Sequence, residues 1–183
     1  MTLSNLCIVL ALGVAVPQFY GLSNPAGFRD ALRKFPRNTR IGYVLMTIAT
    51  AWFLWHVKQE SIADFSAFKP YMYLGFGLLG LGTCIYLKDF LAVRGLALVM
   101  MLLAKLLLDT QRWHDSNWCW VLGVLAYAWI VAGIWFTVSP WRCRDIIGWM
   151  TATDARVKIG CALRLALGVL VAALGATVFR TGE

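Results

Sequence analysis

The sequence has few charged residues, and none of its acidic residues falls in the middle of a long apolar run. Charged residues make up only 14% of the chain, against about 25% in soluble domains. Its nine carboxylates lie between the apolar runs or at their ends. Because ion-coupled transporters and pumps usually carry carboxylates within the membrane as proton or sodium sites, their placement here argues against that class of protein.

Catalytic and metal-binding motifs are also missing from the sequence. The chain contains no HExxH, no GxSxG and no glycine loop of the phosphate-binding kind. Its five cysteines are scattered and show no CxxC spacing, whereas a zinc site or a disulfide framework needs a tighter arrangement. These absences predict a protein that is not an enzyme and has no metal centre.

Long hydrophobic runs, in contrast, are abundant. Hydrophobic residues form 60% of the 183 residues and the mean hydropathy is +0.69. A membrane-spanning helix needs about 20 apolar residues. The sequence therefore predicts one all-α membrane domain over 1–183, a polytopic helix bundle built from helical hairpins. The six predicted spans lie near 3–21, 41–57, 71–87, 90–108, 118–138 and 159–179. The third and fourth could instead form one broken unit, because the turn around Lys88 and Asp89 is very short.

The basic residues predict the orientation of these spans. No Lys or Arg precedes Arg29, so we expect the first span to be a retained helix and not a cleaved leader. Short loops rich in Lys and Arg stay in the cytoplasm, which predicts that both termini lie outside it. The side of the first, third and fifth loops has twelve basic residues: Arg29, Arg33, Lys34, Arg37, Arg40, Lys88, Arg94, Arg142, Arg144, Arg156, Lys158 and Arg164. The opposite side has five: Lys58, Lys69, Lys105, Arg112 and Arg180.

Two predicted cytoplasmic loops have the pattern of short amphipathic helices in the headgroup layer. These are residues 24–36 and 140–150, and the helices after them open similarly, with Arg40-Ile41-Gly42 and Lys158-Ile159-Gly160. We interpret this as repeated hairpins; ordinary interfacial loops are the alternative. The net charge of +8 is then explained by contacts with lipid phosphates and not with nucleic acid. The residues predicted to contact headgroups or a partner subunit are Arg29, Arg33, Lys34, Arg37, Trp141, Arg142, Arg144 and Arg164.

Residues 140–177 carry a pattern that resembles a known family. A proline, an aromatic–arginine pair, an amphipathic stretch and an Asp before a basic residue precede a glycine-rich apolar helix. The residues concerned are Pro140, Trp141, Arg142, Asp154, Arg156 and Gly160. In these features the segment, about a fifth of the chain, resembles the small bacterial inner-membrane proteins of the YjeT type. The resemblance implies a location in the bacterial inner membrane and an accessory role.

Small residues spaced along the predicted spans indicate close helix packing, either within the bundle or toward another subunit. They are Gly75, Gly77, Gly80 and Gly82 in the third span and Gly168, Ala172 and Ala176 in the sixth.

Two histidines, His56 and His114, lie at span ends on the same predicted side. Imidazole is a favoured ligand of haem and metals, although histidines at span ends in a chain rich in tryptophan are more often simply interfacial.

Three functions remain open at this point. The preferred hypothesis is a non-catalytic accessory or structural subunit of a larger membrane assembly, with lipids and other membrane-protein subunits as partners. A cofactor-binding subunit would hold haem, quinone or pigment through His56 and His114. A passive path for a small solute or lipid would need a continuous polar lining, and the predicted spans offer few residues for one.

Overall fold

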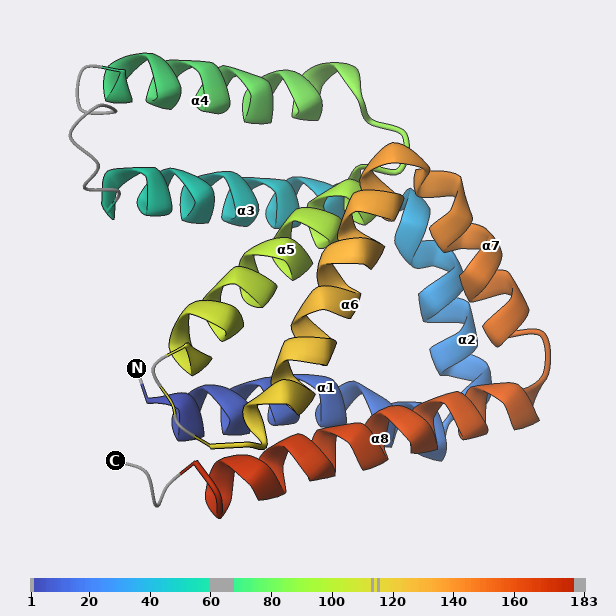
Figure 1. The fold of residues 1–183 in the computed structure, drawn as a ribbon. Helices are drawn as coiled ribbons and strands as arrows, with labels where there is room; N and C mark the ends of the chain where they lie inside the picture. The colour runs from blue at the N-terminus through green and yellow to red at the C-terminus, as the bar shows by residue number, and fades with distance from the viewer. Residues whose placement is uncertain (1, 60–67, 113, 115, 180–183) are drawn as a thin grey trace. The chain divides into compact units, whose positions relative to one another are not determined.

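Helices account for all the regular structure in the part of the chain that the structure describes. The computed structural model describes residues 2–59, 68–112, 114 and 116–179, and no strand occurs in these ranges. The helical fold class predicted from the sequence is therefore confirmed. The long helices are α1 (Leu3–Ser23), α3 (Thr39–Gln59), α4 (Lys69–Tyr86), α5 (Leu91–Gln111), α6 (Cys119–Val138) and α8 (Asp154–Ala176) (Figure 1). The short helices are α2 (Pro25–Lys34), the 3-10 helix η1 (Phe35–Arg37) and α7 (Pro140–Met150).

Four of these helices are long and apolar enough to cross a membrane, namely α1, α5, α6 and α8. The chain thus has the composition of a membrane protein, whereas the prediction of six spans is not confirmed. Helices α3 and α4 are not apolar enough to count as candidate spans, although they occupy the intervals of the second and third predicted spans. The reason lies in their sequences: α3 has His56 and Lys58 in its last turn, and α4 begins with Lys69 and contains four glycines.

Local sequence explains where the helices begin and end. The hydroxyl of Thr2 accepts from the Asn5 amide at 3.3 Å, and that of Thr153 accepts from the Arg156 amide at 3.3 Å. Such side-chain caps satisfy amides that have no partner within the first turn. Pro25 and Pro140 begin α2 and α7, where the fixed φ of proline suits the first helical position. Helix α8 starts five residues earlier than the predicted span, and Arg180 lies outside the described residues.

The chain divides into two compact units. The first contains Met1–Arg33, Leu103–Ile130 and Arg144–Glu183, and the second contains Lys34–Leu102 and Val131–Cys143. The core of the first unit joins α1, the second half of α5, the first half of α6 and the end of α8. Its most buried side chains are Cys7, Ala104, Leu107, Leu122, Ala126 and Phe179.

Helices α1 and α8 pack side by side in opposite directions in the first unit (Figure 1). Near one end the Ser4 hydroxyl donates to the Gly175 carbonyl at 2.7 Å. Near the other, a Cβ added to Gly21 would lie 3.0 Å from the Phe28 ring and closer still to the sulfur of Cys161. Cys161, Gly168 and Gly175 are buried at seven-residue intervals, which places them on one face of α8. Small residues at this seam let the two backbones approach closely.

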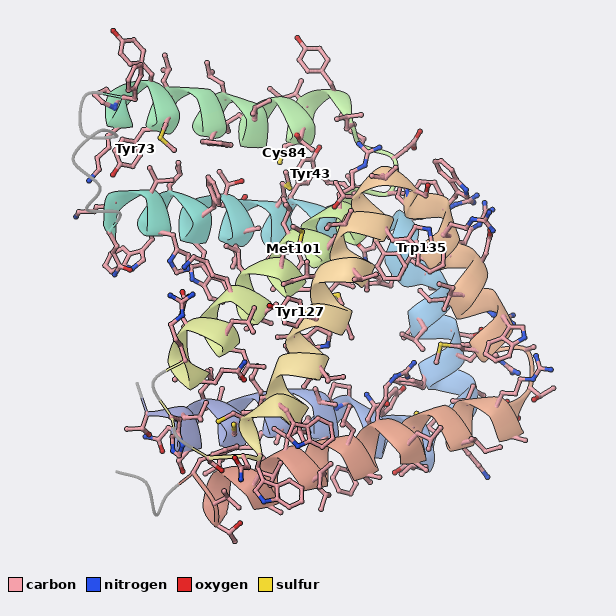
Figure 2. The ribbon with its side chains drawn as sticks, viewed as in Figure 1. Tyr43, Tyr73, Cys84, Met101, Tyr127 and Trp135 are labelled. Atoms are coloured by element: carbon pink, nitrogen blue, oxygen red, sulfur yellow. The ribbon has the colours of Figure 1, made fainter. Side chains whose placement is uncertain are left out.

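The second unit contains α3, α4, the first half of α5 and the end of α6. Phe53 and Phe76 meet edge to face with ring centroids 4.7 Å apart, and Gly80 lies against Thr50. Figure 2 shows Tyr43 from α3 and Cys84 from α4 between these two helices. Helices α4 and α5 are separate, and Phe90 in the turn between them has a φ of 57°.

Candidate functional site

A paired hydrogen bond in the first unit joins α2 to the turn between α7 and α8. Arg33 donates from Nε to the Thr151 hydroxyl at 3.0 Å and from Nη2 to the Thr151 carbonyl at 2.9 Å. Thr151 is 1% exposed, and its hydroxyl also donates to the Ile147 carbonyl at 2.7 Å. Paired donors in the planar guanidinium fix direction as well as distance. This contact therefore anchors one amphipathic helix to the end of the other.

A second link between α2 and α8 is weaker. Arg29 Nη1 lies 3.0 Å from the Asp154 carboxylate, with 29% and 57% of the two side chains exposed. Exposed ion pairs contribute about 0–1 kcal/mol because water and salt screen them. Asp154 also lies in the first turn of α8, where a negative charge interacts favourably with the helix dipole.

The other residues predicted to contact headgroups are exposed. Lys34, Arg37, Trp141, Arg142 and Arg144 all have exposed side chains, and Arg144 pairs with the neighbouring Asp145 at 3.0 Å. Their contact with lipid or with a partner stays a prediction. On the buried face of α7, burial raises the pKa of the Cys143 thiol to about 11, so this thiol is protonated at neutral pH.

Sequence reasoning missed a contact at the same corner. The Arg156 guanidinium lies over the Trp149 ring, 5.2 Å from its centroid, and also donates to the Trp149 carbonyl at 3.3 Å. An arginine over an indole ring gains from the negative face of the ring. In the sequence the two residues are seven positions apart, but this spacing does not predict the contact by itself. The contact forms because the turn after Met150 brings the two side chains together.

Arg164 differs from the other predicted headgroup residues because it is half-buried within a candidate span. Ten residues separate it from the start of α8 at Asp154, a rise of about 15 Å. The sixth predicted span begins at 159, five residues before Arg164, and the earlier part of α8 carries the charged residues Asp154, Arg156 and Lys158. Its Nη2 lies 3.2 Å from the sulfur of Met150.

A cavity adjoins Arg164 in the first unit. Its volume is about 290 Å³, and it lies between α1, the first half of α6 and α8. Apart from the guanidinium, its lining is apolar: Leu10, Ala11, Val14, Leu125, Trp129, Leu167, Gly168 and Val171. A smaller pocket on the other side of Arg164 includes Phe28, Met150, Thr151 and Arg156. Arg164 thus borders both the apolar cavity and the corner formed with α2.

The two histidines lie in different units. His56, in the second unit, stacks on Trp52 with ring centroids 6.3 Å apart. His114, in the first, meets Phe179 edge to face at 5.3 Å, and both of its ring nitrogens are buried without a hydrogen-bond partner among the residues that the structure describes. No group of three or more His, Cys, Asp or Glu side chains suited to a metal occurs in the ranges described.

The predicted packing residues divide into two sets. Gly80 contacts Thr50, Gly168 lies against Ala11 and Ala15, and Ala172 packs at the edge of the first unit's core. Ala176 is exposed, and Gly175 makes the contact with α1 in its place.

The remaining glycines, Gly75, Gly77 and Gly82, are open. Within the described part of the chain, a Cβ added at any of them meets no atom within 4 Å. Gly75 and Gly82 are seven residues apart on α4 and so share one face of that helix.

Comparisons with known protein families, curated proteins and solved structures find no match to this chain. The resemblance of residues 140–177 to the YjeT type stays a prediction. The arrangement described above can anchor helices, pack against other helices and hold an apolar or anionic group.

Proposed function

We propose that this chain is a non-catalytic accessory subunit of a larger membrane assembly in the bacterial inner membrane. The open face of α4, defined by Gly75 and Gly82, carries the proposal. Small residues that share one face of a helix allow another helix to approach closely in lipid. The large side chains beside them, Leu74, Leu78 and Leu79, are more than half exposed, so a partner helix would also gain contact area on this face.

This role requires α3 and α4 to cross the membrane together with the other four long helices, giving six spans with both termini outside the cytoplasm. Two features support that arrangement. Helices α3 and α4 are 21 and 18 residues long, close to the about 20 needed to span the hydrocarbon. Exposed apolar side chains also run along both helices, among them Val44, Ile48, Leu78 and Leu81.

The proposal is tested by replacing the two glycines together with leucine. In Gly75→Leu/Gly82→Leu, the band of the assembly on native gels, run after extraction in mild detergent, should disappear or move to a lower mass. The two isobutyl groups would hold the partner helix away. The matched control is Gly13→Leu on α1. Gly13 is equally open, but no small residue lies seven positions before or after it. An unchanged gel pattern for the double variant would argue against the α4 face as the docking surface.

A cofactor-binding function is the second candidate, and the ring of His114 favours it. Burying a polar group without a partner is costly, and both nitrogens of this ring are in that state. A haem or pigment coordinated there would remove the cost for one nitrogen. Visible absorption of the purified protein, lost in His114→Ala, would support this function; a colourless preparation without bound cofactor by mass spectrometry would exclude it.

A further inference from the structure

The guanidinium of Arg164 lacks a counter-charge. It is half-buried inside α8, one of the four helices suited to span a membrane. No carboxylate in the described ranges forms an ion pair with it, and its hydrogen-bond acceptor is the sulfur of Met150. A thioether is a weak acceptor, whereas a guanidinium has five N–H donors. A cation within a membrane-spanning helix is costly and usually pairs with an anion or a polar group.

The apolar cavity beside this cation has the size and lining of an acyl-chain site. Its volume of about 290 Å³ lies at the lower end of ligand sites, which run from about 300 to 1,000 Å³. Ala11 and Gly168 contribute small surfaces to the lining, while Leu10, Leu125 and Trp129 supply large apolar ones.

The position of Arg164 also gives the site a direction. Side chains on a helix tilt toward its N-terminus, and the contact with Met150 shows that Arg164 reaches toward the start of α8. There it borders the smaller pocket that includes Thr151 and Arg156. A molecule with its chain in the cavity would therefore place its polar end near two guanidinium groups.

We propose that the cavity between α1, α6 and α8 binds one acyl chain of an anionic phospholipid, whose phosphate is held by Arg164. The phosphate replaces the thioether as acceptor and forms charge-assisted hydrogen bonds, while the chain fills the apolar lining. This site lies in the first unit and goes beyond the proposed accessory function, which rests on α4 in the second unit.

The test is a competition between two phospholipids with identical acyl chains, measured by native mass spectrometry. The purified full-length protein is mixed with equal amounts of phosphatidylglycerol, which is anionic, and phosphatidylcholine, which is zwitterionic. Wild type is expected to retain phosphatidylglycerol at least fivefold more than phosphatidylcholine. Arg164→Gln should abolish that preference: the guanidinium favours the net negative headgroup of phosphatidylglycerol over that of phosphatidylcholine, whose phosphate charge is balanced by the choline ammonium.

Matched variants separate this site from general attraction to basic loops. Arg40→Gln removes an exposed charge at the start of α3, outside the set of residues predicted to contact headgroups, and should leave the preference unchanged. Gly168→Leu and, from the opposite wall, Val14→Phe should each lower retention of phosphatidylglycerol by filling the cavity while Arg164 remains. Circular dichroism identifies any variant that fails to fold, and two cavity variants are used so that one folded protein suffices.

Two results would overturn the proposal. One is an equal preference for phosphatidylglycerol in wild type and folded Arg164→Gln. The other is a loss of preference in Arg40→Gln as large as that in Arg164→Gln, which would assign the effect to surface charge. Neither result depends on the native-gel pattern of the α4 variants, so this proposal and the accessory function can fail separately.

Discussion

At the scale of single residues, glycine determines how closely the helices of the first unit approach. A Cβ added to Gly175 would lie 2.8 Å from the Cβ of Cys7 and 3.1 Å from the Ser4 carbonyl oxygen. The carbonyl belongs to the backbone of α1, so it cannot move aside as a flexible side chain would. The Ser4 hydroxyl donates to the Gly175 carbonyl at the same point, which also holds the two helices close together.

Gly175→Leu is therefore expected to destabilise the seam between α1 and α8. Overpacking of a close contact costs about 1–3 kcal/mol, which should lower the melting temperature measured by tryptophan fluorescence in detergent. Gly13→Leu, at an open position on α1, is the control and should melt like wild type. Equal melting temperatures for both variants would show that the seam tolerates a side chain at Gly175.

The case of Gly175 also shows a limit of the sequence. Spacing by four residues indicated a face with Gly168, Ala172 and Ala176, yet the buried positions on α8 follow a seven-residue interval through Cys161, Gly168 and Gly175. Both patterns include Gly168, and composition alone does not distinguish them. Which of the two patterns faces α1 depends on the register between the two helices. That register is set by contacts between residues far apart in the chain, such as Ser4 and Gly175.

At the scale of helices, α2 is held to α7 and α8 by two contacts of different strength. The Arg33 fork reaches a buried threonine, whereas the Arg29 pair is exposed to solvent. Loss of one partner is more costly when the remaining group is buried, because that group then lacks both water and a hydrogen bond. The two arginines are close in sequence and on the same short helix, so they form a natural comparison.

Arg33→Gln should destabilise the protein by about 1.5 kcal/mol, the lower end for hydrogen bonds to charged groups, because Arg33 is itself exposed. Arg29→Gln should cost less, within about 1 kcal/mol. Thermal unfolding of the two variants in the same detergent and salt checks the order. If Arg29→Gln were the more damaging change, the anchoring role assigned to Thr151 would be contradicted.

The positions of the helices could be predicted from the sequence, whereas the contacts that hold α2 to α7 and α8 could not. Runs of apolar residues placed the long helices within a few residues, and Pro25 and Pro140 marked the starts of α2 and α7. The contact of Arg33 with Thr151 spans 118 residues and requires the packing of α1 on α8. The Thr153 cap also begins α8 five residues before the predicted span, in a charged stretch that the apolar pattern did not indicate.

At the scale of the whole molecule, the open question is whether α3 and α4 cross the membrane. Both helices have an apolar surface and polar ends. Among the helices described, α1, α5, α6 and α8 are the ones long and apolar enough to span. With four spans, α3 and α4 would form a hairpin on one side, and its tip would share that side with Arg37 and Lys88. With six, the tip would lie on the opposite side. The two termini share one side of the membrane in both cases, so they do not distinguish the two topologies.

Gln59 at the end of α3 is therefore the decisive position, because it is exposed and lies at that tip. In a background with all five cysteines replaced by serine, Gln59→Cys should react with an impermeant maleimide added to intact cells if six helices span. Asn117→Cys, before α6, should react in either topology, and Arg37→Cys in neither. Protection of Gln59→Cys alongside a reactive Asn117→Cys would establish four spans. It would also move the Gly75 and Gly82 face out of the hydrocarbon, where close helix contact could no longer be the reason for those glycines.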